Sequence, residues 1–244
     1  MEIITDIADR EFSSDTGFWT KGPGWTIDGG KANANIVANP SFLSSKVVAT
    51  IGKWHKIQVD VTITSGSINY ISGGAGIQKQ LTSGINTFYS LHNGNTGQAV
   101  FVGFPGFIGS IDNISVQEVG WSDSTNLYNY IYANTTGTAG QKEYAAVKAA
   151  AMWRNVNNDP VLASDYGKKF NKYARKLLSI DIAYYNAANP TALWGWDIPT
   201  QAQLTTLSSN GGNALKVGGT NYWNTSNGIN STGLTLLGGG YRLS

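Results

Sequence analysis

The stretch Trp54-His55-Lys56-Ile57-Gln58-Val59-Asp60-Val61-Thr62-Ile63-Thr64 alternates apolar and polar residues along its length. Successive side chains of a β-strand point to opposite faces of a sheet, so this period of two predicts a half-buried strand. Gly, Asn and Ser separate similar segments at intervals of roughly ten residues. This pattern is typical of an all-β sandwich, and we expect one of about eight strands over residues 1–119. The other segments are residues 47–51, 67–71, 84–91, 99–104 and 109–116.

After Trp121 the period changes to that of helices. The Ala-rich run at 144–153 has strong helix propensity and predicts a helix over 138–153. Further helices are expected over 124–132, 166–185 and 199–207, with sparse regular structure from Ser208 onward. The boundary is placed near Gly120, and the second domain, residues 121–244, is expected to be α+β.

The composition excludes several classes of protein. Only 13% of the 244 residues are charged and the formal net charge is +2, which gives no electrostatic reason to expect nucleic acid as a partner. The absence of Cys excludes disulfides and thiolate metal sites. No apolar run reaches the roughly 18 residues of a membrane helix, and the first six residues are acidic where a secretion signal would be basic. We expect a soluble chain without membrane insertion or an export signal.

The inventory of catalytic side chains is thin. The two histidines are His55 and His92, and no Gly-x-Ser-x-Gly motif accompanies them. His55 is expected at the surface or at a sheet edge. The acidic residues are scattered singly, whereas a glycosidase needs a carboxylate pair. The sequence therefore predicts a protein that is not an enzyme.

Aromatic residues with neutral amides nearby are a pattern that suits sugars, because aromatic rings stack on the apolar faces of pyranoses and amides satisfy the hydroxyls. Core or interface packing is the alternative for each ring. The candidate stacking residues are Trp19, Trp54, Tyr70 and Tyr89, with Asn69, Gln78 and Asn86 as polar neighbours.

Residues 12–19, 24–32, 56–61 and 109–116, taken in order, resemble the jelly-roll carbohydrate-binding modules, which occur in secreted glycosidases and in phage tail and fibre proteins. The resemblance implies a jelly-roll sandwich. It also implies a structural Ca²⁺ at Asp112, with Asp9 or Glu11 as further oxygen ligands. The alternative is that Asp112 accepts backbone N–H bonds in a turn.

Motifs at 166–174, 195–200, 214–216, 222–223, 230–234 and 238–242 resemble, in order, the Fibrobacter-type major paralogous domain. That family is similar to the C-type-lectin-like fold and is frequent in surface and phage proteins of gut Bacteroidetes. This chain departs from it at Lys172 and at Gln203-Leu204, and it stops at Ser244, where the family usually continues. A shortened domain completed by a partner and a chain that is part of a longer protein are both open, and both predict an assembly.

Together the two resemblances imply a bacteriophage virion protein, in a tail or fibre-like appendage, that serves attachment or host-glycan recognition. Its expected partners are other virion proteins or further copies of itself, and a host cell-surface glycan. Its expected location is the virion, assembled in the host cytoplasm. The alternative is a glycan-binding accessory module of a bacterial surface or secreted protein, located at the cell surface.

Overall fold

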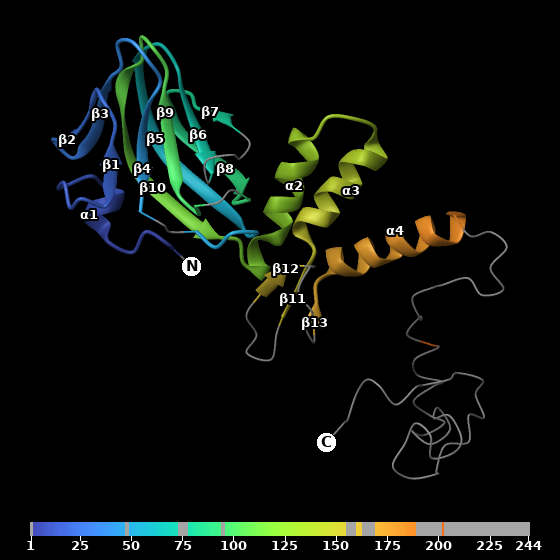
Figure 1. The fold of residues 1–244 in the computed structure, drawn as a ribbon. Helices are drawn as coiled ribbons and strands as arrows, with labels where there is room; N and C mark the ends of the chain where they lie inside the picture. Colours follow the sequence, from blue (N-terminus) through green and yellow to red (C-terminus); the bar gives the residue numbers. More distant parts are fainter. Residues whose placement is uncertain are drawn as a thin grey trace, which may run out of the picture. The chain divides into compact units, whose positions relative to one another are not determined.

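Two antiparallel sheets lie face to face in the first part of the chain (Figure 1). The computed structural model describes residues 2–46, 49–72, 78–93, 96–154, 160–162, 169–188 and 202. Within these residues each sheet has five strands. The first has the order β2 (Trp25–Asp28), β3 (Lys31–Asn35), β10 (Ile108–Glu118), β5 (Trp54–Ser65), β8 (Gly84–Leu91). The second has the order β1 (Trp19–Lys21), β4 (Ser41–Ser45), β9 (Ala99–Gly103), β6 (Ile68–Ser72), β7 (Lys79–Gln80). The predicted β-sandwich is confirmed.

Strand β5 follows the alternation that its sequence predicts. Ile57, Val59 and Val61 are buried in the core between the sheets, and the polar residues between them face outward. The strand pairs with β8 on one side and with β10 on the other, so it occupies a central place in its sheet. Tyr70 and Phe88 fill the core from the facing sheets with ring centroids 5.2 Å apart.

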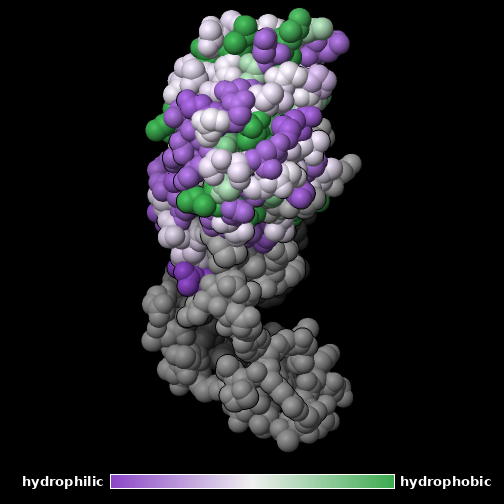
Figure 2. All heavy atoms as spheres, turned by 90° about the vertical axis from the view of Figure 1, so that its left-hand side faces the viewer, coloured by the Kyte–Doolittle hydropathy of each residue, from purple (hydrophilic) through white to green (hydrophobic). Residues whose placement is uncertain are grey.

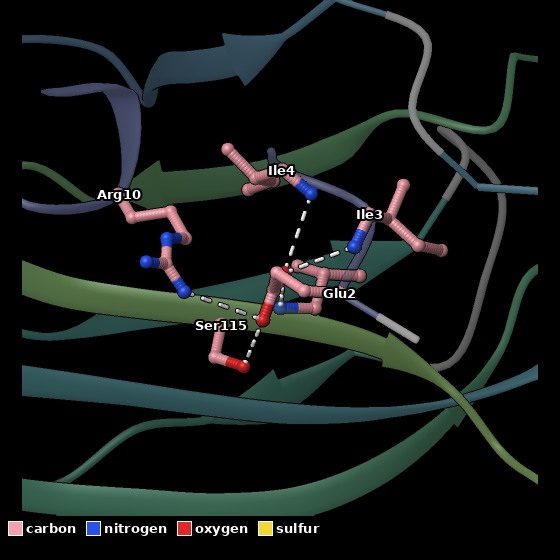
Figure 3. A network of polar contacts seen from close by, with 6 residues as sticks. Glu2, Ile3, Ile4, Arg10 and Ser115 are labelled. Carbon is pink, nitrogen blue, oxygen red and sulfur yellow. Dashed lines mark hydrogen bonds and ion pairs between the residues drawn. The ribbon is translucent and has the colours of Figure 1, made fainter. Parts of the chain in front are cut away.

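A glutamate at the N-terminus fixes the first segment of the chain to strand β10 (Figure 3). Glu2 Oε1 accepts hydrogen bonds from the backbone N–H groups of Ile3, Ile4 and Val116, and the Ser115 hydroxyl donates to Oε2. Arg10, at the end of the short helix α1 (Ile7–Arg10), lies 3.9 Å from Oε2. The carboxylate therefore satisfies several backbone donors and joins the N-terminal segment to the sandwich.

Helices follow the last strand of the sandwich. The turn η1 (Trp121–Asp123) leads into α2 (Ser124–Asn134), and α3 (Ala139–Ala150) begins with a capping box formed by Thr138 and Gln141. The three-stranded sheet β12 (Pro160–Leu162), β11 (Met152–Arg154), β13 (Lys169–Phe170) and helix α4 (Lys172–Ala188) come next. Two predicted boundaries were wrong: the helix over 138–153 ends at Ala150, and the helix over 166–185 begins at Lys172.

The side chain of Asn171 explains both boundaries. Its Oδ1 accepts hydrogen bonds from the N–H groups of Met152 and Ala174, and its Nδ2 donates to the carbonyl of Ala150. Asn171 is buried, and its own N–H donates to Met152 O. One side chain therefore satisfies the end of α3 and the beginning of α4, so the chain leaves the helix at Ala150.

Helices α2 and α3 pack against the sandwich. Tyr89 from β8 and Val119, directly after β10, meet Leu127 from α2 and Ala149 from α3 in one buried cluster, which also contains Met152. The chain divides into two compact units, residues 1–180 and residues 181–244. Gly120 lies within the first of these units, and the domain boundary expected near it stays a prediction. No helix among the described residues is long and apolar enough to cross a membrane.

Most of the C-type-lectin-like prediction lies outside the described residues. The motifs from 195 onward all fall there, and so does the helix expected over 199–207 apart from Ala202. In the described part, the face seen in Figure 2 carries mostly hydrophilic and intermediate residues, with hydrophobic ones in small separate groups.

Candidate functional site

A cleft of about 280 Å³ lies where the edge strands β7 and β8 meet helix α2. Trp54 from β5 and Tyr89 from β8 contribute aromatic side chains, and Tyr130 and Ile131 contribute from α2. Polar residues also line the cleft: Gln78, Lys79, Ser90, Asn93, Asn134 and Thr135.

The pleat of β5 and β8 decides from which face of the sheet each ring reaches the cleft, which Trp54, Phe88 and Tyr89 all line. In β8, Phe88 belongs to the sandwich core and its neighbour Tyr89 belongs to the cluster under the helices. Trp54 pairs with Leu91, which lies two residues after Tyr89 in β8. Trp54 and Tyr89 therefore project from the same face of the sheet, and Trp54 is partly exposed. Helix α2 then brings Tyr130 against Tyr89, with ring centroids 5.3 Å apart and ring planes at 52°. The cleft therefore has an aromatic wall built by three elements.

A carboxylate outside the cleft holds Tyr89 in place. The Tyr89 hydroxyl donates to Asp123 Oδ2 at 2.8 Å, and Asn126 Nδ2 donates to the other oxygen of the same carboxylate. Burial raises the pKa of Tyr89, and the hydrogen bond to Asp123 raises it further. Burial also raises the pKa of Tyr130. Both side chains are therefore neutral phenols at physiological pH.

Amides at the rim of the cleft offer both donors and acceptors. Gln78 is exposed and its Oε1 accepts from Asn69 Nδ2 at 2.9 Å, which leaves its Nε2 as a donor toward a ligand. Asn134 is exposed and its Nδ2 donates to the carbonyl of Tyr130, which orients its side-chain oxygen as an acceptor. An aromatic wall with neutral amides at its rim can stack on one face of a sugar ring and bind its hydroxyls.

The structure brings together two of the four predicted stacking residues. Trp54 and Tyr89 both line the cleft, together with the predicted polar neighbour Gln78. Trp19 and Tyr70 do not. Both lie in the sandwich core, with 3% and 0% of their surface exposed, and neither lines the cleft. Tyr89 is itself only 9% exposed, so Trp54 is the more accessible ring of the pair.

Hydrogen bonds within the protein occupy the polar groups of Trp19 and of the predicted polar neighbours Asn86 and Asn69. Trp19 Nε1 donates to the carbonyl of Asp9 in the interior. The side chain of Asn86 is occupied by a turn, where it bonds to Thr82 and to the carbonyl of Gly84. Asn69 reaches the cleft only through its bond to Gln78.

Sequence reasoning missed the contribution of α2 and of β7. Tyr130 and Asn134 are four residues apart and therefore share one face of the helix. The only local indication of this contribution is the Tyr-rich run Tyr128-Asn129-Tyr130-Ile131-Tyr132. It does not show which tyrosine contacts the sandwich. Lys79 lies in a strand of two residues, and no sequence pattern indicated that it would line the cleft.

The expected calcium ligands are not brought together. Asp112 Oδ1 accepts the N–H of Asn113, whose φ of 50° lies at a register shift between β10 and β5. Asp9 is buried and accepts a hydrogen bond from the Thr16 hydroxyl, and Glu11 is exposed. Among the described residues no three acidic or histidine side chains gather as a metal site. Asp112 bonds the backbone, as its alternative role requires, but it does so at a bulge within β10 rather than in a turn, and the calcium site stays a prediction.

No protein-family model matches the chain, and no curated protein matches it. Several solved structures are similar to part of it. A mutant of CBM29-2, a family 29 carbohydrate binding module, is 12% identical, with 48% of this chain and 83% of that chain covered and a TM-score of 0.35. A structure described as CBM4 is 15% identical, with 49% and 95% covered and a TM-score of 0.28. The module CBM6cm-2 from Cellvibrio mixtus lichenase 5A, in complex with cellotriose, is 16% identical, with 49% and 99% covered and a TM-score of 0.29. The sandwich of this chain is assigned from its own sheets and their register.

Proposed function

We propose that this chain recognises glycans in the cleft between β7, β8 and α2, and that it does so without catalysing a reaction. One observation carries the proposal: Trp54 and Tyr89, singled out from sequence as sugar-stacking residues, lie in the same cleft with amides at its rim. A pyranose ring would place its apolar face on the aromatic wall and its hydroxyls on Gln78 and Asn134.

The size of the cleft supports a short glycan segment. Ligand sites in proteins commonly have volumes of about 300 to 1,000 Å³. The 280 Å³ of this cleft lies just below that range, which suits one or two sugar rings rather than a long chain. A polysaccharide would therefore be bound at an end or through a side branch.

The chemistry of the lining supports binding rather than hydrolysis. A glycosidase places two carboxyl groups about 5 to 10 Å apart across the scissile bond. No carboxylate is among the described residues that line this cleft. Asp123, just outside it, is bonded to Tyr89 and Asn126.

Substitution of Trp54 tests the proposal. A glycan array selects the tightest oligosaccharide, and calorimetry then compares the variants with it. We expect Trp54→Ala to weaken binding about tenfold, because the stacking surface is lost. Asn134→Ala, at an exposed helix position that leaves the core intact, should weaken it about threefold through the lost hydrogen bond.

The matched control is Phe42→Ala, a partly exposed aromatic on β4 in the other sheet. We expect its affinity to equal that of the unchanged chain. Loss of binding in Phe42→Ala with Trp54→Ala unaffected would move the site to the outer face of that sheet. Circular dichroism on each variant shows whether the fold is kept.

We also propose where such a module works: in a bacteriophage tail or fibre-like appendage, with other virion proteins or copies of itself as partners. The ordered motifs between 166 and 242 and the neutral composition support this placement. Peptides of this chain in purified phage particles, found by mass spectrometry, are the expected result. Peptides confined to the surface or secreted fraction of bacteria would instead support an accessory module of a bacterial protein.

A further inference from the structure

We propose that the cleft selects anionic sugars, with Lys79 binding a carboxylate or a sulfate ester on the ring that stacks against the aromatic wall. This inference rests on the proposed glycan-binding function and specifies its substrate class.

Lys79 is the charged residue of the cleft. Among the described residues that line it, no other side chain carries a charge at neutral pH, so the lining has a net positive charge. No salt bridge to Lys79 occurs within the described part of the chain. Asp123, the carboxylate associated with Tyr89, already accepts hydrogen bonds at both oxygens. A ligand anion would therefore meet a cation for which no carboxylate of the described residues competes.

The position of Lys79 directs its side chain toward the space between the two sheets. Lys79 lies directly opposite Tyr70 in the antiparallel pair of β6 and β7, and opposite residues project from the same face of a sheet. Tyr70 is in the core, so Lys79 also projects from the inner face, at the edge strand, where it is half-buried near Phe88. A partly desolvated ammonium group gains more from an anion than a fully hydrated one does.

Anionic sugars suit both parts of the cleft. A hexuronate keeps the apolar ring face that an aromatic side chain needs, and its carboxylate takes the place of a neutral hydroxymethyl group. The ammonium group of Lys79 would donate a charge-assisted hydrogen bond to that carboxylate, or to a sulfate oxygen. An inward-pointing Lys on an edge strand can also serve to prevent pairing with another chain, and the experiment separates these two roles.

The test compares acidic oligosaccharides with matched neutral ones. Uronate trisaccharides are measured by calorimetry beside their carboxyl-reduced forms, and sulfated trisaccharides beside their desulfated forms. We expect the acidic member of at least one pair to bind about tenfold more tightly, with an affinity that falls between 20 and 300 mM NaCl. The pair whose two members differ in affinity shows whether the cleft prefers a carboxylate or a sulfate ester.

Variants assign the preference to a residue. Lys79→Gln should abolish the difference within the pair, and Lys79→Arg should retain most of it. Lys31→Gln makes the same charge change on β3, which β10 and β5 separate from β8, and it should leave both affinities unchanged.

Three outcomes would overturn the inference. Equal or tighter binding of the neutral members contradicts it while leaving the proposed function intact. Unchanged acidic binding in Lys79→Gln, with increased self-association in light scattering, assigns the lysine to edge protection alone. Failure of every acidic and neutral glycan to bind removes the proposed function, and the inference with it.

Discussion

The charge of the two histidines depends on their burial. His55 and His92 are fully buried, with ring centroids 4.5 Å apart, so the expectation of a surface or edge position for His55 was wrong. His55 Nδ1–H donates to the carbonyl of Lys53, which leaves Nε2 as the unprotonated nitrogen. Burial lowers the pKa of His55 to about 3, with a smaller contribution from His92, and lowers that of His92 to about 4. Both rings are therefore neutral in the folded protein.

Acid should destabilise the protein through these two residues. The unfolded histidines titrate near 6.5 and the folded ones well below, so between these values the unfolded state binds more protons. Their contribution to stability is present above pH 6.5 and is lost as the pH falls toward 4. Between pH 7 and pH 5 we expect the free energy of unfolding to fall by about 2 kcal/mol for each histidine.

Urea unfolding across this range measures the effect. His92→Gln removes one titrating group and should reduce the slope against pH by about half, even where it lowers the stability itself. An unchanged slope in His92→Gln would show that other groups cause the acid sensitivity.

At the scale of elements, Asn171 joins α3, β11 and α4. The three hydrogen bonds of its side chain satisfy backbone groups of Ala150, Met152 and Ala174 in a buried position. Tyr173, the second residue of α4, stacks on Tyr128 of α2 with ring centroids 4.8 Å apart. The polar contact therefore sets the end of one helix, and the aromatic contact sets where the next helix packs.

Removal of this side chain should be costly. Asn171→Ala removes the side-chain partner of two N–H groups, those of Met152 and Ala174, and of the carbonyl of Ala150, and we expect a loss of about 2 to 4 kcal/mol in the free energy of unfolding. Chemical denaturation followed by circular dichroism measures it. Asn129→Ala, at an exposed position of α2, serves as the control and should change the stability by less than about 0.5 kcal/mol. Equal stabilities of the two variants would contradict the role given to Asn171.

At the scale of the molecule, the sandwich and the helices α2 and α3 share one packed unit. Leu127 of α2 is fully buried in the cluster that contains Tyr89 of β8 and Met152 of β11. The aromatic wall of the cleft depends on the same contact, because α2 carries Tyr130. Any change that releases α2 should therefore also open the cleft.

Substitution of a residue in this cluster should destabilise both the helices and the sandwich. We expect Leu127→Ala to lower the free energy of unfolding by about 2 to 4 kcal/mol and to speed amide hydrogen exchange in β8 as well as in α2. Leu178→Ala, at a residue that is 48% exposed, makes the same chemical change with little effect. Faster exchange confined to α2, with β8 unchanged, would show that the helices and the sandwich are separate units.

The alternation of apolar and polar residues was enough to predict the sandwich. The phase of β5 places Ile57, Val59 and Val61 on one face, and a period of two needs no knowledge of distant residues. The same phase puts His55 on the buried face, so the strand pattern already contradicted the surface position that its neighbours Trp54 and Lys56 suggested.

Only the tertiary structure decided which aromatic rings a ligand can reach. The sequence pattern does not distinguish the four candidate rings, Trp19, Trp54, Tyr70 and Tyr89. The exposure of each ring depends on which other residues cover it. Long-range packing places Tyr70 between the sheets and Tyr89 under α2, and it brings Lys79 and Tyr130 to the same cleft. Binding requires accessible groups close together in space, and contacts between residues far apart in the chain fix that arrangement.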